Sequence, residues 1–261
     1  MSEDRPLLLT RDGPLAVLTL DSPPANLFDS AMVRAWSAAV ERLTARPPRG
    51  LLIRAEGPVV SAGVDVTLFR DLPAEEAAAF WAGQLATVRA LERLPCPVVF
   101  AAHSLTLTAA FEIALACDLV VATRSARFGL VERRIAFTPA MGGTQRLAAR
   151  AGTARAAELV LSGELYRGER LAEWGVVNAL LPVATFHDDA RAYAARLAEG
   201  PTRAHAATKR VLREFGDGGV EAADRVLPEL AGELAATTDH RRAVAAFIAS
   251  GPEHETVYDG R

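Results

Sequence analysis

The chain is poor in cysteine and in the signals that accompany export. Its 261 residues include only two cysteines, Cys96 and Cys117, each inside an apolar segment. Two isolated thiols provide neither a disulfide framework nor the ligand spacing of a zinc site, so we expect no metal. The opening MSEDRPLLLT carries two acids and one arginine before a short apolar triplet, unlike a secretory signal. We therefore expect a cytoplasmic protein.

A strong charge of one sign is also missing. The formal net charge is −3, so no basic field indicates a nucleic-acid partner. An uncharged run over residues 94–111 raises the possibility of a membrane span, but Pro95, Pro97 and His103 interrupt it. A buried strand followed by a buried helix explains the run better. We expect a small-molecule partner, no nucleic acid and no membrane.

Strands and helices are expected to alternate in the first half of the chain. Because 50% of the residues are hydrophobic, the chain can bury one sizeable core. Apolar runs between turn residues predict strands at residues 15–20, 51–55, 97–102, 119–122 and 176–180, with helices between them. From about residue 184 onward the Ala/Arg/Glu-rich sequence is helical. We predict an α/β core over residues 1–195 and a C-terminal helical segment over residues 196–261.

Two glutamates lie in settings where a carboxylate is unexpected. Glu112 is enclosed by the apolar LTLTAAFEIALACDLVVA, and Glu132 lies between FGLV and the turn-rich PAMGGTQR. Burying a carboxylate costs free energy unless a partner or a function requires it. Two such groups are typical of general acid/base chemistry. Two structural alternatives remain: Glu112 paired with Arg146, and Glu132 in a solvated ion pair with the arginines that follow it.

Four sequence blocks together resemble the enoyl-CoA hydratase/isomerase (crotonase) family. They are SAGVD from Ser61, FEIALACD from Phe111, FGLVE from Phe128 and PAMGGTQRL from Pro139, in the family's order and spacing. The resemblance runs from about residue 14 to the C-terminus. It implies a crotonase-like spiral of ββα units, a C-terminal trimerisation segment, and a homotrimer or dimer of trimers. It also implies acyl-CoA thioester substrates and no cofactor, because CoA is part of the substrate.

The resemblance assigns roles to individual residues. Glu112 and Glu132 match the two catalytic glutamates, and the N–H groups of Val64 and Ala109 match the two donors of an oxyanion hole. The N–H of Ala140 matches a position that holds the water, and Ala25, Ala62 and Asp65 match positions along the CoA. Main-chain donors aimed at a developing oxyanion are effective in a dry site.

The family usually has a glycine-rich run where this chain has Thr108, Ala109 and Ala110, and no glycine occurs between Gly83 and Gly129. If one of these positions needs a positive φ, its side chain costs about 1 kcal/mol or more. Three functions remain open. Hydration of a 2-enoyl-CoA uses both glutamates. Another acyl-CoA reaction on the same scaffold, such as double-bond isomerisation, needs only one carboxylate. A non-catalytic acyl-CoA-binding paralogue would explain the lost glycines.

Overall fold

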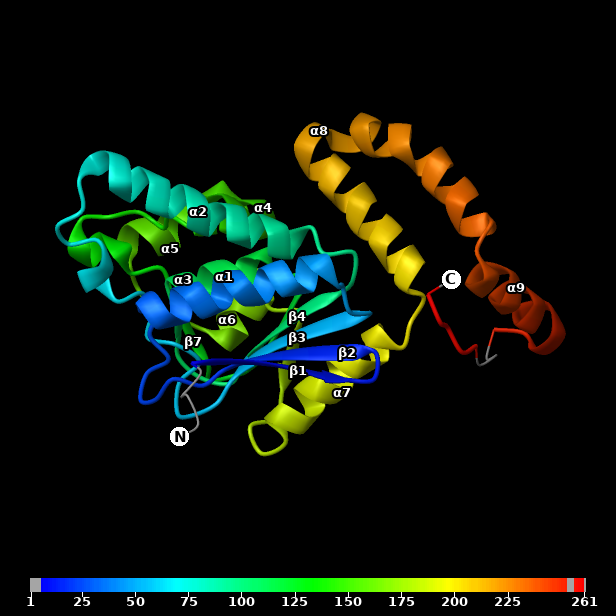
Figure 1. Ribbon diagram of the computed structural model, residues 1–261, viewed down its shortest axis with the longest axis horizontal. Helices are drawn as coiled ribbons and strands as arrows, with labels where there is room; N and C mark the ends of the chain where they lie inside the picture. Colours follow the sequence, from blue (N-terminus) through cyan, green and yellow to red (C-terminus); the bar gives the residue numbers. More distant parts are fainter. Residues whose placement is uncertain (1–5, 253–255, 261) are drawn as a thin grey trace.

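A six-stranded sheet forms the centre of the computed structural model (Figure 1), which describes residues 6–252 and 256–260. Residues 1–5, which contributed to the expectation of no export signal, lie outside this range. Strand order is β1-β2-β3-β4-β6-β9, with β1 antiparallel to β2 and all later neighbours parallel. The strands are β1 (Leu7–Asp12), β2 (Leu15–Leu20), β3 (Gly50–Ala55), β4 (Val98–Ala102), β6 (Leu119–Thr123) and β9 (Ala179–Leu181).

Three short strands form a second sheet beside the first. Their order is β5-β7-β8, and they are β5 (Thr106–Leu107), β7 (Arg127–Gly129) and β8 (Tyr166–Arg167). The α-helices are α1 (Ser30–Ala45), α2 (Ala74–Glu92), α3 (Ala109–Ala116), α4 (Gly143–Ala151), α5 (Thr153–Ser162), α6 (Gly168–Glu173), α7 (Phe186–Ala198), α8 (Thr202–Ala235) and α9 (Thr238–Ser250). Two 3₁₀ helices, η1 (Val66–Leu68) and η2 (Glu132–Ile135), complete the described elements.

Both faces of the large sheet are covered, so its inner strands β2, β3, β4 and β6 are almost entirely buried. On β2, Ala16 and Leu18 face the core shared with α1 to α3, whereas Val17 faces α7. The two layers of helices on either side of the sheet are visible in Figure 1. A parallel sheet needs this double cover, and its strands consequently read as continuous apolar runs. The predicted α/β class is confirmed.

Two local expectations differ from the structure. The strand predicted at residues 176–180 is shifted to Ala179–Leu181, because the N–H groups of Val176 and Val177 both donate to the Leu171 carbonyl at the end of α6. Strand β1 was not predicted. It is an edge strand with mostly exposed side chains, so it lacks the apolar pattern on which the prediction depended.

The C-terminal helices α8 and α9 extend away from the sheet (Figure 1). The boundary predicted between residues 195 and 196 falls inside α7, whose final Ala198 still packs against the sheet, so the chain leaves the core a few residues later. Lys209 attaches α8 to the core, since its Nζ donates to Asp118 Oδ2 (2.7 Å) and to the Cys96 carbonyl (2.9 Å). Within α8, Gly218 and Gly219 leave helical geometry and bend the helix. Among the described helices, none is both long and apolar enough to cross a bilayer.

Candidate active site

A cavity of about 220 Å³ gathers five of the predicted site residues. It opens between α3, η1, η2 and the loop before α4, which come from distant parts of the sequence. The five predicted residues in its wall are Ala62, Val64, Glu112, Glu132 and Ala140. Ala25, Asp65 and Ala109 are not part of the wall.

Glu112 is fixed by the backbone of another segment. Its carboxylate is only 2% exposed, and Oε2 accepts hydrogen bonds from the N–H groups of Met141 (2.8 Å) and Gly143 (2.7 Å). Burial, together with the charge of Glu132, raises the pKa of Glu112 to about 8 against the opposing effect of these hydrogen bonds. The alternative partner Arg146 instead donates to Glu92, with Nη2 and Oε2 2.7 Å apart. The structure therefore does not support the ion pair with Arg146.

The loop before α4 needs glycine to enclose this carboxylate. Gly142 has φ +96°, which suits glycine, and the next residue approaches the glutamate side chain closely. A Cβ on Gly143 would lie 2.8 Å from Glu112 Cγ. The Gly-Gly pair thus allows the N–H groups of Met141 and Gly143 to reach the same oxygen atom of Glu112.

Glu132 opens η2 and faces the same cavity. Its Oε2 atom is buried and has no hydrogen-bond partner among the described residues. Burial raises the pKa of Glu132 to about 7. The neighbouring Arg133 donates to the Ser162 carbonyl (2.6 Å) instead, so the solvated ion pair is not found. A buried carboxyl with an unused oxygen can exchange a proton with a molecule inside the cavity.

The two predicted oxyanion donors differ in their present partners. The N–H of Val64 donates to Thr108 Oγ1 at 3.1 Å. Ala109 is the first residue of α3, and its N–H has no acceptor within the described part of the chain. Thr108 precedes it as the N-cap and lines the cavity. This free N–H lies at the N-terminus of a helix, where the helix dipole favours negative charge.

Of the predicted CoA-binding residues, Ala62 is part of the cavity wall, whereas Ala25 and Asp65 lie beside it. Ala25 accepts a hydrogen bond from the N–H of Ala62 (2.9 Å), so these two residues are adjacent. Asp65 caps η1 by accepting from the N–H and hydroxyl of Thr67, and these hydrogen bonds lower its pKa. The Asp65 side chain is therefore occupied in shaping the loop.

Asn26 positions this loop, although the sequence analysis did not single it out. Its Oδ1 accepts from Ser22 N (2.6 Å), and its Nδ2 donates to the carbonyls of Glu56 (2.9 Å) and Val59 (3.1 Å). Its own carbonyl accepts from the hydroxyl of Ser61, at the start of the SAGVD block. The signal in the sequence was weak, since an asparagine after Pro-Pro-Ala also suits an ordinary turn.

Three aromatic side chains form one wall of the cavity. The ring centroids of Phe69, Trp81 and Phe137 lie between 5.3 and 5.7 Å from one another. They come from the segment after η1, from α2 and from the segment after η2, so no local pattern predicts their meeting. Together they give this side of the cavity an apolar surface.

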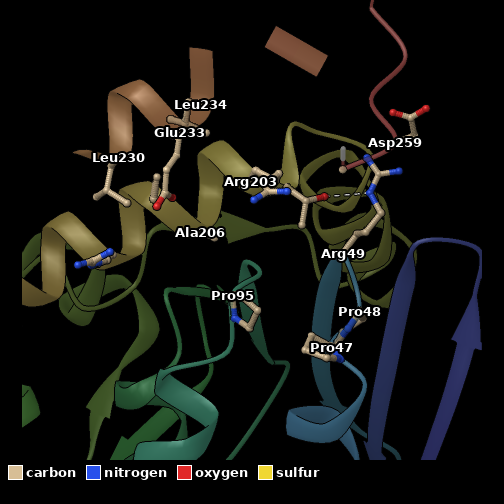
Figure 2. Close-up of a pocket in the computed structure, with 14 residues that line it drawn as sticks. Pro47, Pro48, Arg49, Pro95, Arg203, Ala206, Leu230, Glu233, Leu234 and Asp259 are labelled. Atoms are coloured by element: carbon tan, nitrogen blue, oxygen red, sulfur yellow. Dashed lines mark hydrogen bonds between the residues drawn. The ribbon is translucent and has the colours of Figure 1, made fainter. Parts of the chain in front are cut away.

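A second cavity, of about 480 Å³, lies between the core and the C-terminal helices. Figure 2 shows prolines of the core, including Pro47 and Pro95, facing Arg203 and Leu230 of α8. None of the predicted site residues lines it. Among the described residues there is also no cluster of three or more His, Cys, Asp or Glu side chains suited to a metal ion. We therefore assign the candidate active site to the smaller cavity around the two glutamates.

The sequence is similar to those of known proteins. The sequence model described as "Enoyl-CoA hydratase/isomerase" matches residues 10–252. The "Probable enoyl-CoA hydratase" of Bacillus subtilis (strain 168) is 31% identical over 238 residues, covering 90% of this chain and 92% of the relative. The "Carnitinyl-CoA dehydratase" of Salmonella enteritidis PT4 is 32% identical over 223 residues, covering 85% and 84%.

Solved structures show the same fold. The enoyl-CoA hydratase of Mycobacterium smegmatis superposes with a TM-score of 0.87 at 25% identity, covering 94% of this chain and 96% of that one. The "Enoyl-CoA hydratase" of Polaromonas sp. JS666 gives a TM-score of 0.86 at 25% identity, covering 93% and 96%. The chain adopts the crotonase fold and belongs to the enoyl-CoA hydratase/isomerase family.

Proposed function

We propose that this protein is an enoyl-CoA hydratase, which reversibly adds water across the 2,3-double bond of a 2-enoyl-CoA thioester. The observation that carries this proposal is the pair of buried carboxyl groups, Glu112 and Glu132, in the wall of one cavity. Hydration requires two proton movements, one away from water as it attacks C3 and one toward C2. Isomerisation requires only one carboxylate, so the presence of both favours hydration.

The raised pKa values of the two glutamates suit these two proton transfers. With values of about 8 for Glu112 and about 7 for Glu132, the pair holds roughly one proton near neutral pH. One carboxyl can then accept a proton from water while the other supplies a proton to carbon. The N–H of Ala140, in the same cavity wall, is our candidate for holding that water.

Negative charge develops on the thioester oxygen when C3 is attacked. We propose that two donors stabilise it: the free N–H of Ala109 at the start of α3, and a second donor from the hydrogen-bonded pair of Val64 and Thr108. The CoA would then pass along Ala25, Ala62 and Asp65, and the acyl chain would contact the aromatic wall. No cofactor is required, because the CoA belongs to the substrate.

We further propose that the chain acts in the cytoplasm as a homotrimer or dimer of trimers. Both cysteines are free and buried thiols, which fits a reducing compartment. The helices α8 and α9 expose several large apolar side chains, which an isolated chain would leave in water. They are Leu212, Phe215, Val220, Leu227, Val244, Phe247 and Ile248.

The reaction is tested with crotonyl-CoA, whose conjugated-enoyl absorbance disappears on hydration. We expect turnover by the natural protein and at least a hundredfold loss of kcat in both Glu112→Gln and Glu132→Gln. Glutamine keeps an oxygen that can accept from Met141 and Gly143, so the Glu112 variant retains its local geometry. The same change at the exposed Glu75 of α2 is the control.

Other outcomes would change either the mechanism or the function that we propose. Unchanged turnover in Glu112→Gln would remove that residue from the mechanism. Conversion of a 3-enoyl-CoA without hydration of crotonyl-CoA would indicate an isomerase. Measurable binding of enoyl-CoA with no turnover at all would indicate a non-catalytic acyl-CoA-binding protein.

A further inference from the structure

A threonine hydroxyl group occupies the position in front of the Val64 N–H, where an oxyanion would be expected to bind. The N–H of Val64, one of the two predicted donors, is already hydrogen-bonded to Thr108 Oγ1 at 3.1 Å. A substrate oxygen bound to that N–H would have to take the same place as the hydroxyl. The Val64 amide and a substrate oxygen therefore cannot meet directly while Thr108 keeps this position.

The backbone of Thr108 supports a specific use for this side chain. Its φ of +43° lies in the left-handed region, where glycine is favoured and a β-branched residue is an outlier. A glycine would adopt this conformation without strain, and the chain instead retains a threonine there. Such an outlier in a ligand cavity is a reason to look for a function of the side chain.

The hydroxyl group is also held in place. An added Cβ on Gly63 would lie 2.2 Å from Thr108 Oγ1 and 3.3 Å from its Cγ2, so the side chain packs closely over that glycine. Branching at Cβ further restricts rotation about χ1. The Thr108 side chain, at the N-cap of α3, is thus held against the loop that carries Gly63 and Val64.

The hydroxyl proton remains available to a ligand. Thr108 Oγ1 accepts from Val64, while its O–H has no acceptor among the described residues, and the side chain lines the cavity beside Glu112. A hydroxyl can donate and accept at the same time. Donation by the amide polarises the hydroxyl and makes its own proton a stronger donor.

We propose that the Thr108 hydroxyl, rather than the Val64 amide, is the donor that contacts the thioester oxygen. This inference rests on the proposed acyl-CoA function and changes the composition of the oxyanion site. The O–H of Thr108 and the N–H of Ala109 receive the developing charge, and the Val64 amide acts through Thr108. No proton is transferred, since both groups only donate hydrogen bonds.

Variants that separate the hydroxyl from the shape of the side chain test this assignment. Thr108→Val keeps the branched shape without the hydroxyl, and we expect kcat for crotonyl-CoA hydration to fall about 10²–10³-fold. Thr108→Ala also removes the hydroxyl but frees the Val64 amide, so we expect a smaller loss of about tenfold or more. Thr108→Ser restores the donor and should recover most of the kcat. Thr44→Val, the same change on the exposed side of α1, is the matched control.

A spectroscopic measurement tests the contact without turnover. Butyryl-CoA labelled with ¹³C at the thioester carbonyl cannot be hydrated, so its bound C=O stretch can be read by infrared difference spectroscopy. We expect a shift to lower frequency on binding to the natural protein and to Thr108→Ser, and a smaller shift with Thr108→Val and Thr108→Ala. Circular dichroism melts confirm that each variant is folded.

Two results would overturn the assignment. Thr108→Ala hydrating crotonyl-CoA as fast as the natural protein, or faster, would identify the hydroxyl as an obstruction. A carbonyl frequency that is the same in all four proteins would exclude the contact. Because the infrared shift needs only binding, it tests Thr108 even if the natural protein shows no hydration, which would defeat the proposed function alone.

Discussion

Glu112 and Glu132 are held by their surroundings in different ways. One oxygen of Glu112 accepts two backbone N–H groups, which fixes the orientation of the carboxyl group. Glu132 keeps a buried oxygen without a partner in the described structure. The first residue is therefore restrained at a fixed place in the cavity, whereas the second depends on a bound molecule to complete its hydrogen bonding.

The buried carboxyl group of Glu132 makes folding stability depend on pH. Burial raises the pKa of Glu132 from 4.5 to about 7, so the folded state holds this proton more tightly than the unfolded chain does. Its contribution is complete below pH 4.5 and is lost as the pH rises through 7. Glu132→Gln has no such loss, so we expect its Tm to exceed that of the natural protein by a margin that grows from pH 4.5 to pH 8.

Thermal melts across this pH range measure the margin. Glu75→Gln, on the exposed side of α2, controls for the removal of a carboxylate from the surface. A margin that is constant or shrinks as the pH rises would contradict the raised pKa of Glu132.

The sequence reveals some site residues more readily than others. A charge inside an apolar run is visible without any structure, which is why Glu112 could be singled out. Thr108 and Asn26 act through segments 44 and 30 positions away, at Val64 and Glu56. Trp81 has the apolar spacing of a core residue, and only the fold brings it to the cavity beside Phe69. Contacts of this kind cannot be read from local spacing.

At the scale of elements, the start of α4 connects the cavity to the core. We predict that Gly143→Ala lowers kcat at least tenfold, because the new methyl group would push the Glu112 side chain out of the hydrogen bonds at Met141 and Gly143. Overpacking at this buried position should also lower the free energy of unfolding by about 1–3 kcal/mol.

A glycine in open space provides the control for this prediction. Gly83 lies within α2 with no atom close to where its Cβ would be, so Gly83→Ala should raise stability by about 0.5–1 kcal/mol. Steady-state kinetics and urea denaturation of the two variants give the comparison. Normal turnover by Gly143→Ala would show that the loop can move away from the glutamate at little cost.

Elements with strong local signals were predicted accurately. Residues 15–20 form β2 as expected, and the strand expected at residues 119–122 lies within β6. The two-residue strands β5 and β8 were not predicted, because they are too short to show a period of two. Such strands depend on their neighbours in space rather than on their own composition.

At the scale of the whole molecule, the C-terminal helices leave an apolar surface that assembly would cover. We predict a solution mass of three or six times the 27.8 kDa chain mass. Replacing Leu212 and Phe215 together by Asp should shift this mass toward the monomer, since burying an unpaired carboxylate in an interface is costly. Light scattering after size-exclusion chromatography measures the mass.

Val183→Asp is the control for assembly, because Val183 is 71% exposed in the loop before α7, away from the C-terminal helices. It should leave the mass unchanged. A double variant at Leu212 and Phe215 with the natural mass would place the subunit contacts elsewhere on the molecule.

The contact between Lys209 and Asp118 joins α8 to the end of α3. Asp118 follows the end of α3, the helix that carries Glu112, whereas the bend at Gly218 and Gly219 lies farther along α8. The bend is thus separated from the cavity by an anchored stretch of helix. In the trimer that we propose, the part of α8 beyond this bend can consequently change its angle to suit a neighbouring subunit without moving α3.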